Sequence, residues 1–255
     1  MLQSKTTMKR RAYLRTVSLA VPGFLLSGWA PARAFTRPIA LNVVDGAVGP
    51  DAESLRAGVE MGLDEVTQNA RVLDVPLIIH RPGMLAGDGP AVPCSEGAVH
   101  LVVVTEDDLH PADDDATPCG ARIYTSPLRE WRPDAWSVAS PLPSLRRPQE
   151  ARLDWHPTLD TPAAAQLNAR FLRRTGRQMD AAAWRGWMAV KVAFEVAMRS
   201  QAGEDDLLAL RFDGHKGRPL RFSEDGHLVQ PTCRMVGGRA VLAPPVDHEL
   251  LMDAD

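Results

Sequence analysis

The sequence lacks the short motifs that mark the common enzyme classes. Its 255 residues contain no GxSxG nucleophile elbow, no HExxH zinc motif and no phosphate-binding P-loop. Cysteine occurs only three times and never as CxxC, which leaves zinc-ribbon and thioredoxin-like interpretations without support. The histidines are scattered without the spacing of metal ligands. We therefore expect a protein that is not an enzyme and that holds no metal and no cofactor.

Basic residues are scarce once the N-terminal segment is set aside. The whole chain has a formal net charge of −3, but residues 1–34 hold six Lys or Arg and no acidic residue. The remainder has 23 basic and 32 acidic residues, a net charge of −9. Such an acidic chain does not suit nucleic acid or an anionic membrane surface as a partner.

Residues 1–34 have the composition of an export signal. A basic stretch, "MKRRAYLRT", precedes the apolar "VSLAVPGFLLSGWA", and "ARA" follows as a small-residue cleavage site. The apolar stretch is too short to span a bilayer and is interrupted by Pro22 and Gly23. The segment from Lys9 to Arg15 resembles the twin-arginine export motif, with Lys9 and Tyr13 as departures. Twin-arginine export is favoured over ordinary secretion and over an uncleaved anchor, and it places the mature chain in the periplasm.

Apolar runs predict a parallel sheet. Strands are expected at residues 38–46, 75–80, 99–105 and 121–125. Unbroken Val, Ile and Leu runs are typical of parallel strands covered on both faces. A helix from Asp51 to Ala70 carries Gly58 and Gly62 on its apolar side, where small residues would let it lie close against the sheet. The later crossovers lack helical periodicity, so the fold class is an α/β, doubly wound parallel-sheet lobe with eroded helices.

Three regions follow the leader. Residues 35–126 form the first α/β lobe, residues 127–160 form a proline-rich irregular linker without a clear strand, and residues 161–255 form C-terminal helices and hairpins. The C-terminal region has clear boundary signals: helix caps at Thr161, Gly176 and Asp180, and turns at Asp225-Gly226 and Gly237-Gly238. Trp184 and Trp187 at helical spacing are interpreted as core, with ligand stacking as the alternative.

The carboxyl ends of the predicted strands carry the candidate ligand-binding residues, because ligands of open parallel sheets lie beyond those ends. Apart from His80, which ends the second strand, they are Asp45, Gly46, Arg81, Thr105, Glu106, Thr125 and Ser126. The alternative is that the same residue types cap loops and form turns. Residues 106–115, "EDDLHPADDD", could hold a hard cation, but the spacing is not that of an EF-hand, and a solvated acidic loop is favoured.

An odd number of cysteines in an oxidising compartment suggests one disulfide and one remaining thiol. Cys94 and Cys119 lie in successive crossover loops of the first lobe and are the favoured pair. Cys233 would then be the free thiol.

The order of elements resembles the type I periplasmic binding proteins, the substrate-binding subunits of ABC transporters. The resemblance is carried by "WHPTLDTPAAAQLNARFLRRTGRQMDAAAWRGWMAVKVAFEVAMR", by "FDGHKGRPLRFSEDGHLVQP" and by "DDDATPCGARIYTSP". It is closest to the branch associated with PQQ-dependent (quinoprotein) alcohol dehydrogenase systems. A complete protein of this class needs two lobes of roughly 120–150 residues each, so a mature chain of 221 residues implies that most of the second lobe is missing.

Two functions follow from the resemblance. The first is a solute-binding-like protein linked to quinoprotein alcohol oxidation, with a small-molecule ligand and an ABC permease as partners. The second is a degenerate binding protein that captures no solute and serves as a periplasmic accessory factor. Its partner would be the quinoprotein dehydrogenase or its cytochrome.

The leader generates a direct prediction. Cleavage after Ala34 should give a mature N-terminus at Phe35, which N-terminal sequencing of periplasmic protein checks. Replacing Arg10 and Arg11 by Lys should block export through the twin-arginine route. Unchanged export of that double variant would show that another route is used.

Overall fold

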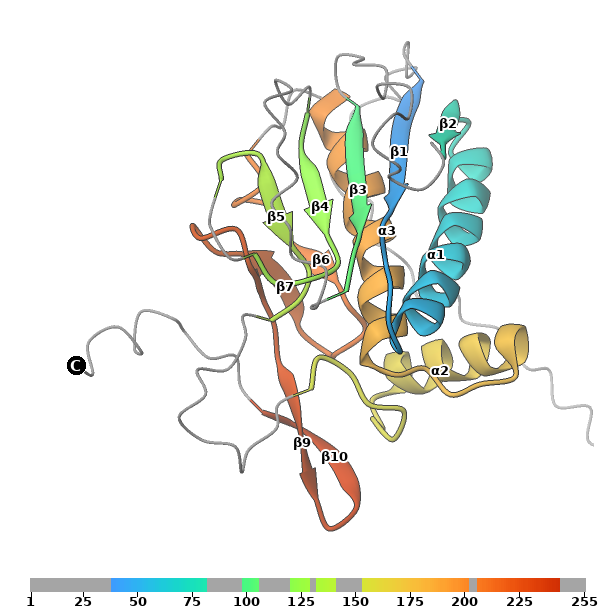
Figure 1. The fold of residues 1–255 in the computed structure, drawn as a ribbon, viewed down its shortest axis with the longest axis vertical. Coiled ribbons are helices and arrows are strands. Elements are labelled where there is room, and N and C mark those ends of the chain that lie inside the picture. Colours follow the sequence, from blue (N-terminus) through green and yellow to red (C-terminus); the bar gives the residue numbers. More distant parts are fainter. Residues whose placement is uncertain are drawn as a thin grey trace, which may run out of the picture. The chain divides into compact units, whose positions relative to one another are not determined.

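A computed structural model describes residues 38–81, 98–105, 120–128, 132–140, 153–201 and 206–243 (Figure 1). The strands of the main sheet are β1 Ile39–Asp45, β2 Leu77–His80, β3 Val99–Val103, β4 Arg122–Tyr124 and β5 Ala135–Ser137. The helices are α1 Ala52–Val72, α2 Pro162–Thr175 and α3 Ala181–Gln201. The C-terminal strands are β6 Phe212–Asp213, β7 Pro219–Phe222, β8 Leu228–Val229, β9 Thr232–Val236 and β10 Arg239–Ala243.

The main sheet is parallel throughout and has the order β2-β1-β3-β4-β5. From β1 the chain first moves to one side, to β2, and then returns to add β3, β4 and β5 on the other side. The strand order therefore reverses between β1 and β3, which is the switch point of a doubly wound sheet. The predicted α/β parallel-sheet fold is confirmed, with the crossovers after β2 and β3 outside the described residues.

Sequence reasoning missed β5, which lies inside the segment interpreted as a linker without a strand. Its central residue Trp136 is in register with Ile123 of β4. The strand has only three residues and follows Pro133, so it gives no apolar run long enough to predict a strand. The main sheet thus extends beyond Ser126, the residue at which we placed the end of the first lobe.

The strands are less evenly buried than their apolar runs predict. Leu41, Leu101 and Ile123 lie buried in the core. Residues of β3 alternate between buried and half-buried, and those of the edge strand β2 alternate between half-buried and exposed. The expectation that the strands are covered on both faces is therefore wrong for the edge strand β2, which has one exposed face, while one face of β3 is partly covered.

Helices α1 and α3 contact each other almost backbone to backbone. In Figure 1, α3 crosses behind β1, β3 and β4, and α1 lies beside it. A Cβ atom at Gly58 would lie 1.9 Å from the Ala183 carbonyl oxygen, and one at Gly186 would lie 2.3 Å from that of Leu55. The small residues of α1 were expected to face the sheet. They face α3 instead, since α3 fills the space that the sequence had assigned to direct helix–sheet contact.

The predicted boundaries of the C-terminal helices are confirmed. Thr161 Oγ1 accepts a hydrogen bond from the Ala164 N–H at 3.2 Å, and Gly176 adopts the left-handed conformation with φ 71° at the end of α2. Asp180 caps α3 by accepting from the Ala183 N–H at 2.8 Å. Trp184 and Trp187 are both 0% exposed, so the core interpretation of this pair is also confirmed.

Both predicted hairpins are present. The turn at Asp225-Gly226 connects β7 and β8, and the turn at Gly237-Gly238 connects β9 and β10. Two isolated bridges, Ser137 to His227 and Leu153 to Cys233, tie these strands to the rest of the chain. Buried residues from the main sheet, the helices and the C-terminal strands form one hydrophobic cluster. Cys233 is a buried free thiol within that cluster.

Several sequence interpretations lie outside the described residues. They concern the export signal 1–34, the Cys94–Cys119 disulfide, Glu106 and the acidic segment 106–115. Within the described part of the chain, no helix combines the length and the apolar character needed to cross a membrane.

The contact between α1 and α3 generates a graded prediction. Gly58→Ala should destabilise the protein by roughly 1–3 kcal/mol through overpacking, because the obstacle is the backbone of α3. Gly62→Ala should cost less, since its closest obstacle is the Val190 side chain, with its Cβ at 2.8 Å. Each variant also gains about 1 kcal/mol in helix propensity. Urea unfolding of both variants measures the difference, and equal stability would contradict a backbone-limited contact.

Candidate functional site

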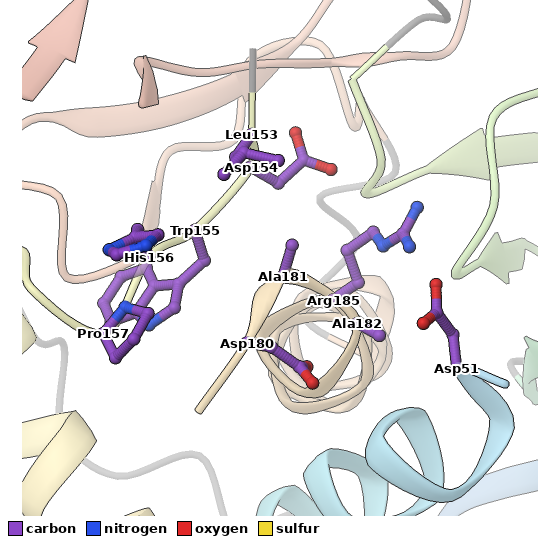
Figure 2. Close-up of a pocket in the computed structure, with 10 residues that line it drawn as sticks. All are labelled: Asp51, Leu153, Asp154, Trp155, His156, Pro157, Asp180, Ala181, Ala182 and Arg185. Atoms are coloured by element: carbon purple, nitrogen blue, oxygen red, sulfur yellow. The ribbon is translucent and has the colours of Figure 1, made fainter. Parts of the chain in front are cut away.

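A cavity of about 420 Å³ lies where the N-termini of α1 and α3 meet the segment 153–157 (Figure 2). Its lining residues are Asp51, Leu153, Asp154, Trp155, His156, Pro157, Asp180, Ala181, Ala182 and Arg185. Helix α1 follows the loop after β1, so Asp51 lies at the carboxyl edge of the sheet beside the switch point. This is the edge at which open α/β sheets bind ligands.

The two helix N-termini differ in how their carboxylates are used. Both Asp180 oxygens are occupied, one by the Ala183 N–H at 2.8 Å and the other by the Ser54 hydroxyl of α1 at 2.6 Å. Asp51 stands at the equivalent position of α1 but makes no side-chain capping hydrogen bond. Asp180 therefore joins the two helices, whereas the exposed carboxylate of Asp51 is open at the cavity.

The segment 153–157 completes the cavity lining and is held in place by contacts with β9, α2 and α3. Leu153 exchanges backbone hydrogen bonds with Cys233 of β9 at 3.0 and 2.7 Å. Trp155 donates its indole N–H to Asn168 of α2 at 3.0 Å and stacks on Trp184 of α3 with the ring centroids 5.9 Å apart. These contacts explain how a segment without a regular helix or strand presents a fixed surface to the cavity.

The lining carries charges of both signs. Asp154 is 9% exposed and accepts from the Gln230 side-chain amide at 3.2 Å and from the Ser140 N–H at 3.3 Å. In Figure 2 the Arg185 guanidinium extends from α3 and lies, in this view, between the carboxylates of Asp154 and Asp51. A solute with both an anionic and a cationic group would meet complementary charges here.

A buried lysine, Lys216, contacts two residues that hold the segment 153–157 in place, Gln230 and Trp184. Lys216 is 1% exposed, and its ammonium donates to Gln230 Oε1 and, at 3.1 Å, to the Pro231 carbonyl. It also lies 3.8 Å from the centroid of the Trp184 ring. Burial lowers the pKa of Lys216 to about 8, while the nearby Asp154 partly opposes that shift.

Two charged residues among the strand-end candidates, Asp45 and Arg81, form local ion pairs. Asp45 receives Arg56 at 2.7 Å and the Ala47 N–H at 3.1 Å. The Asp45 hydrogen bond also raises the pKa of the Arg56 guanidinium. Arg81 pairs with Glu60 of α1 at 2.6 Å. These partners are the loop and helix contacts that the capping alternative describes.

The uncharged strand-end candidates have similar local roles. The Gly46 N–H donates to Val103 at 2.9 Å, the Thr105 hydroxyl donates to Val48 at 2.9 Å, and the Thr125 hydroxyl donates to Val104 at 2.7 Å. The Ser126 carbonyl accepts from the Ser137 hydroxyl at 2.6 Å, while its own Oγ is buried without a hydrogen-bond partner in the described part of the chain. None of the strand-end candidates within the described residues lines the cavity.

The sequence did contain signals for the residues that line the cavity. Asp51 was interpreted only as the start of a helix and Asp180 only as a helix cap, although a helix N-terminus is also a position that binds ligands. Asp154 and Trp155 gave no signal, because their segment has no periodicity. Lys216, which lies behind the cavity lining, gave no signal either, because its stretch between Arg211 and Arg221 contains several other charged residues. Among the described residues, no group of three His, Cys, Asp or Glu side chains is arranged to hold a metal ion.

No protein-family model matches the chain, and no curated protein matches it. Solved structures of ABC-transporter binding proteins do resemble it. A solute-binding protein from R. palustris, in complex with benzoate, is 11% identical with a TM-score of 0.47, and the match covers 82% of this chain and 98% of that chain. A protein of a branched-chain amino acid ABC transporter from Rhodospirillum rubrum is 11% identical with a TM-score of 0.48, covering 80% and 99%.

A leucine-binding protein from Thermotoga maritima is 10% identical with a TM-score of 0.30, covering 82% of this chain but 61% of that chain. The chain therefore spans less than two thirds of the length of this protein. At such identities and scores, the likeness is a partial agreement in the arrangement of helices and strands.

The buried lysine predicts a pH dependence. The pKa of Lys216 is about 8 in the folded state and 10.5 when unperturbed, so the unfolded state binds more protons between these values. The contribution of Lys216 to the free energy of unfolding should therefore rise with pH from about 8 to 10.5, by at most roughly 1.4 kcal/mol per unit, and stay constant below pH 8.

Denaturant unfolding of the protein and of Lys216→Met at half-unit pH steps isolates this effect. The difference between their unfolding free energies should increase above pH 8. A difference that stays constant across the range would show that Lys216 titrates normally.

Proposed function

We propose that the chain is a periplasmic solute-binding-like protein of the ABC-transporter type, and that it binds a small polar solute in the cavity at the switch point. The observation that supports this most is the position of a cavity with charges of both signs at the carboxyl edge of a parallel sheet. Its volume of about 420 Å³ is within the usual range for small-molecule sites.

Residues from each of the three segments that line the cavity have a role in this proposal. Asp51, without a capping hydrogen bond, accepts an ammonium or hydroxyl group of the solute. Arg185 supplies a positive charge for a carboxylate, and Trp155 supplies an apolar wall fixed by Trp184 and Asn168. The polar side chains at the strand ends form local hydrogen bonds and are not assigned to the solute in this proposal.

The sequence resemblance supports a narrower setting. The stretches from Trp155 to Arg199 and from Phe212 to Pro231 resemble the branch associated with PQQ-dependent alcohol dehydrogenase systems. We therefore propose export through the twin-arginine route and an ABC permease or the quinoprotein dehydrogenase as the partner. Permease and ATPase genes beside the coding gene would favour transport. Quinoprotein and cytochrome genes alone would favour an accessory role.

One surface favours the second candidate function, an accessory factor that binds a protein partner. Strands β9 and β10 extend from the body as a two-stranded ribbon (Figure 1). Val236 and Val241 share one face of this ribbon and are 51% and 43% exposed, and Met235 on the opposite face is 47% exposed. Arg234 and Arg239 lie beside them and are also exposed. An apolar ribbon bordered by basic residues suits a protein contact better than solvent.

Calorimetry with amino acids, aromatic carboxylates and small alcohols tests the first function. A solute that carries an ammonium group should bind the protein and should lose roughly tenfold or more in affinity in Asp51→Asn, because a charge-assisted hydrogen bond is lost. Asn remains a good N-cap, so α1 should be unaffected. Asp74→Asn, an exposed substitution just beyond the other end of α1, is the matched control and should bind normally.

The same panel separates the two functions. No binding by any solute, together with copurification of a quinoprotein dehydrogenase or cytochrome that Val236→Asp abolishes, would overturn solute capture in favour of the accessory function. Equal affinity of Asp51→Asn and the unmodified protein for a bound amine would place the solute elsewhere.

A further inference from the structure

Lys216 is buried more completely than a lysine normally is without a paired carboxylate. Its ammonium is satisfied by two neutral oxygens, Gln230 Oε1 and the Pro231 carbonyl, and by the face of Trp184. This arrangement uses two ammonium hydrogens in hydrogen bonds and adds a cation–π contact. If this residue of the loop between β6 and β7 only filled the core, an uncharged side chain would do so as well.

Two routes lead from Lys216 to the cavity. The polar route runs through Gln230, whose amide nitrogen donates to Asp154 at 3.2 Å and to the Val138 carbonyl at 3.0 Å. The aromatic route runs through Trp184, which stacks on Trp155 with an interplanar angle of 9°. Asp154 and Trp155 both line the cavity, so both routes end on the same wall.

We propose that Lys216 is a positioning residue for this wall and a proton switch that sets the charge preference of the cavity. With its proton, Lys216 fixes Gln230 and Trp184, which in turn hold Asp154 and Trp155. When the proton passes to solvent, the cation–π contact is lost and Asp154 loses its positive neighbour. The wall then loosens locally, and the charge around the cavity becomes more negative by one unit. The chain as a whole still gains stability against global unfolding, because a neutral amine costs less to bury than an ammonium.

The groups around Lys216 permit this titration near neutral pH. The titratable groups that face it are Asp154 from the segment 153–157 and Cys233 from β9. Trp184 of α3 and Gln230, which lies between β8 and β9, are neutral. Burial lowers the pKa of Lys216 to about 8, and burial raises that of the Cys233 thiol, so Lys216 loses its proton before Cys233 does.

The composition of the chain allows a direct measurement. The sequence has four lysines, Lys5, Lys9, Lys191 and Lys216. Replacing the other three by Arg leaves Lys216 as the only lysine in the full chain, so a ¹³C-lysine label reports on one group. Titration of its Cε signal should show a midpoint near pH 8, about two units below an ordinary lysine. A midpoint at pH 10 or above would overturn the proposal.

Hydrogen exchange tests the positioning role in the same protein. After correction for the intrinsic pH dependence, exchange in the segment 153–157 should increase several-fold across the midpoint of Lys216. Residues 62–66 in the middle of α1 serve as the internal control and should show no such increase. Lys216→Arg keeps a permanent charge and should remove the step, provided its circular dichroism matches the unmodified protein. No step in the three-Arg protein would overturn the positioning role.

The predicted effect of pH on ligand affinity rests on the proposed function. The titration of Lys216 and its effect on the segment 153–157 do not. For any solute that binds the cavity, affinity for a cation should increase several-fold from pH 7 to pH 9, and affinity for an anion should fall. Absence of solute binding with an intact Lys216 titration would overturn only solute capture. Solute binding without a pH step at the measured midpoint would overturn the charge preference assigned to Lys216.

Discussion

The contact between the backbones of α1 and α3 is the constraint on which the rest of the structure depends. Gly58 on one helix and Gly186 on the other leave no space for a side chain between them. Packing this close sets the two helices side by side with their N-termini at the carboxyl edge of the sheet. The hydrogen bond from Ser54 to Asp180 then fixes that end. The cavity exists because the two N-termini meet there and the chain between 153 and 157 passes over them.

Most of the regular structure could be predicted from the sequence, because it depends on local chemistry. Thr161 and Gly176 end α2 through hydrogen bonds and backbone conformations that their residue types favour. The glycine turns determine the hairpins for the same reason. Strand β5 could not be predicted, since three residues are too few for periodicity and its stability comes from pairing with β4. The sequence likewise did not show that Gly58 packs against α3, because α3 begins more than a hundred residues after it.

The candidate site could be predicted only in its location. Strand direction places the predicted ligand site at the carboxyl edge of the sheet, and the cavity lies at the same edge. The predicted ligand-binding residues that the structure describes do not line the cavity. Polar side chains at the strand ends, such as Asp45 and Thr105, form hydrogen bonds within their own loops, because a buried polar group without a partner is costly. The residues at the cavity come from three segments, with Asp51 more than a hundred positions before the other two, and no local pattern connects them.

Asp51 and Asp180 show how one residue type serves both stability and recognition in the same place. A carboxylate at a helix N-terminus is favoured by the helix dipole whether or not it accepts a capping hydrogen bond. Asp180 accepts one hydrogen bond on each oxygen, so a solute would share oxygens that already cap α3 and bind Ser54. Asp51 has the same electrostatic advantage with its oxygens still available. The cavity can therefore present a negative charge to a ligand at little cost in stability, because the dipole of α1 already stabilises that charge in the empty protein.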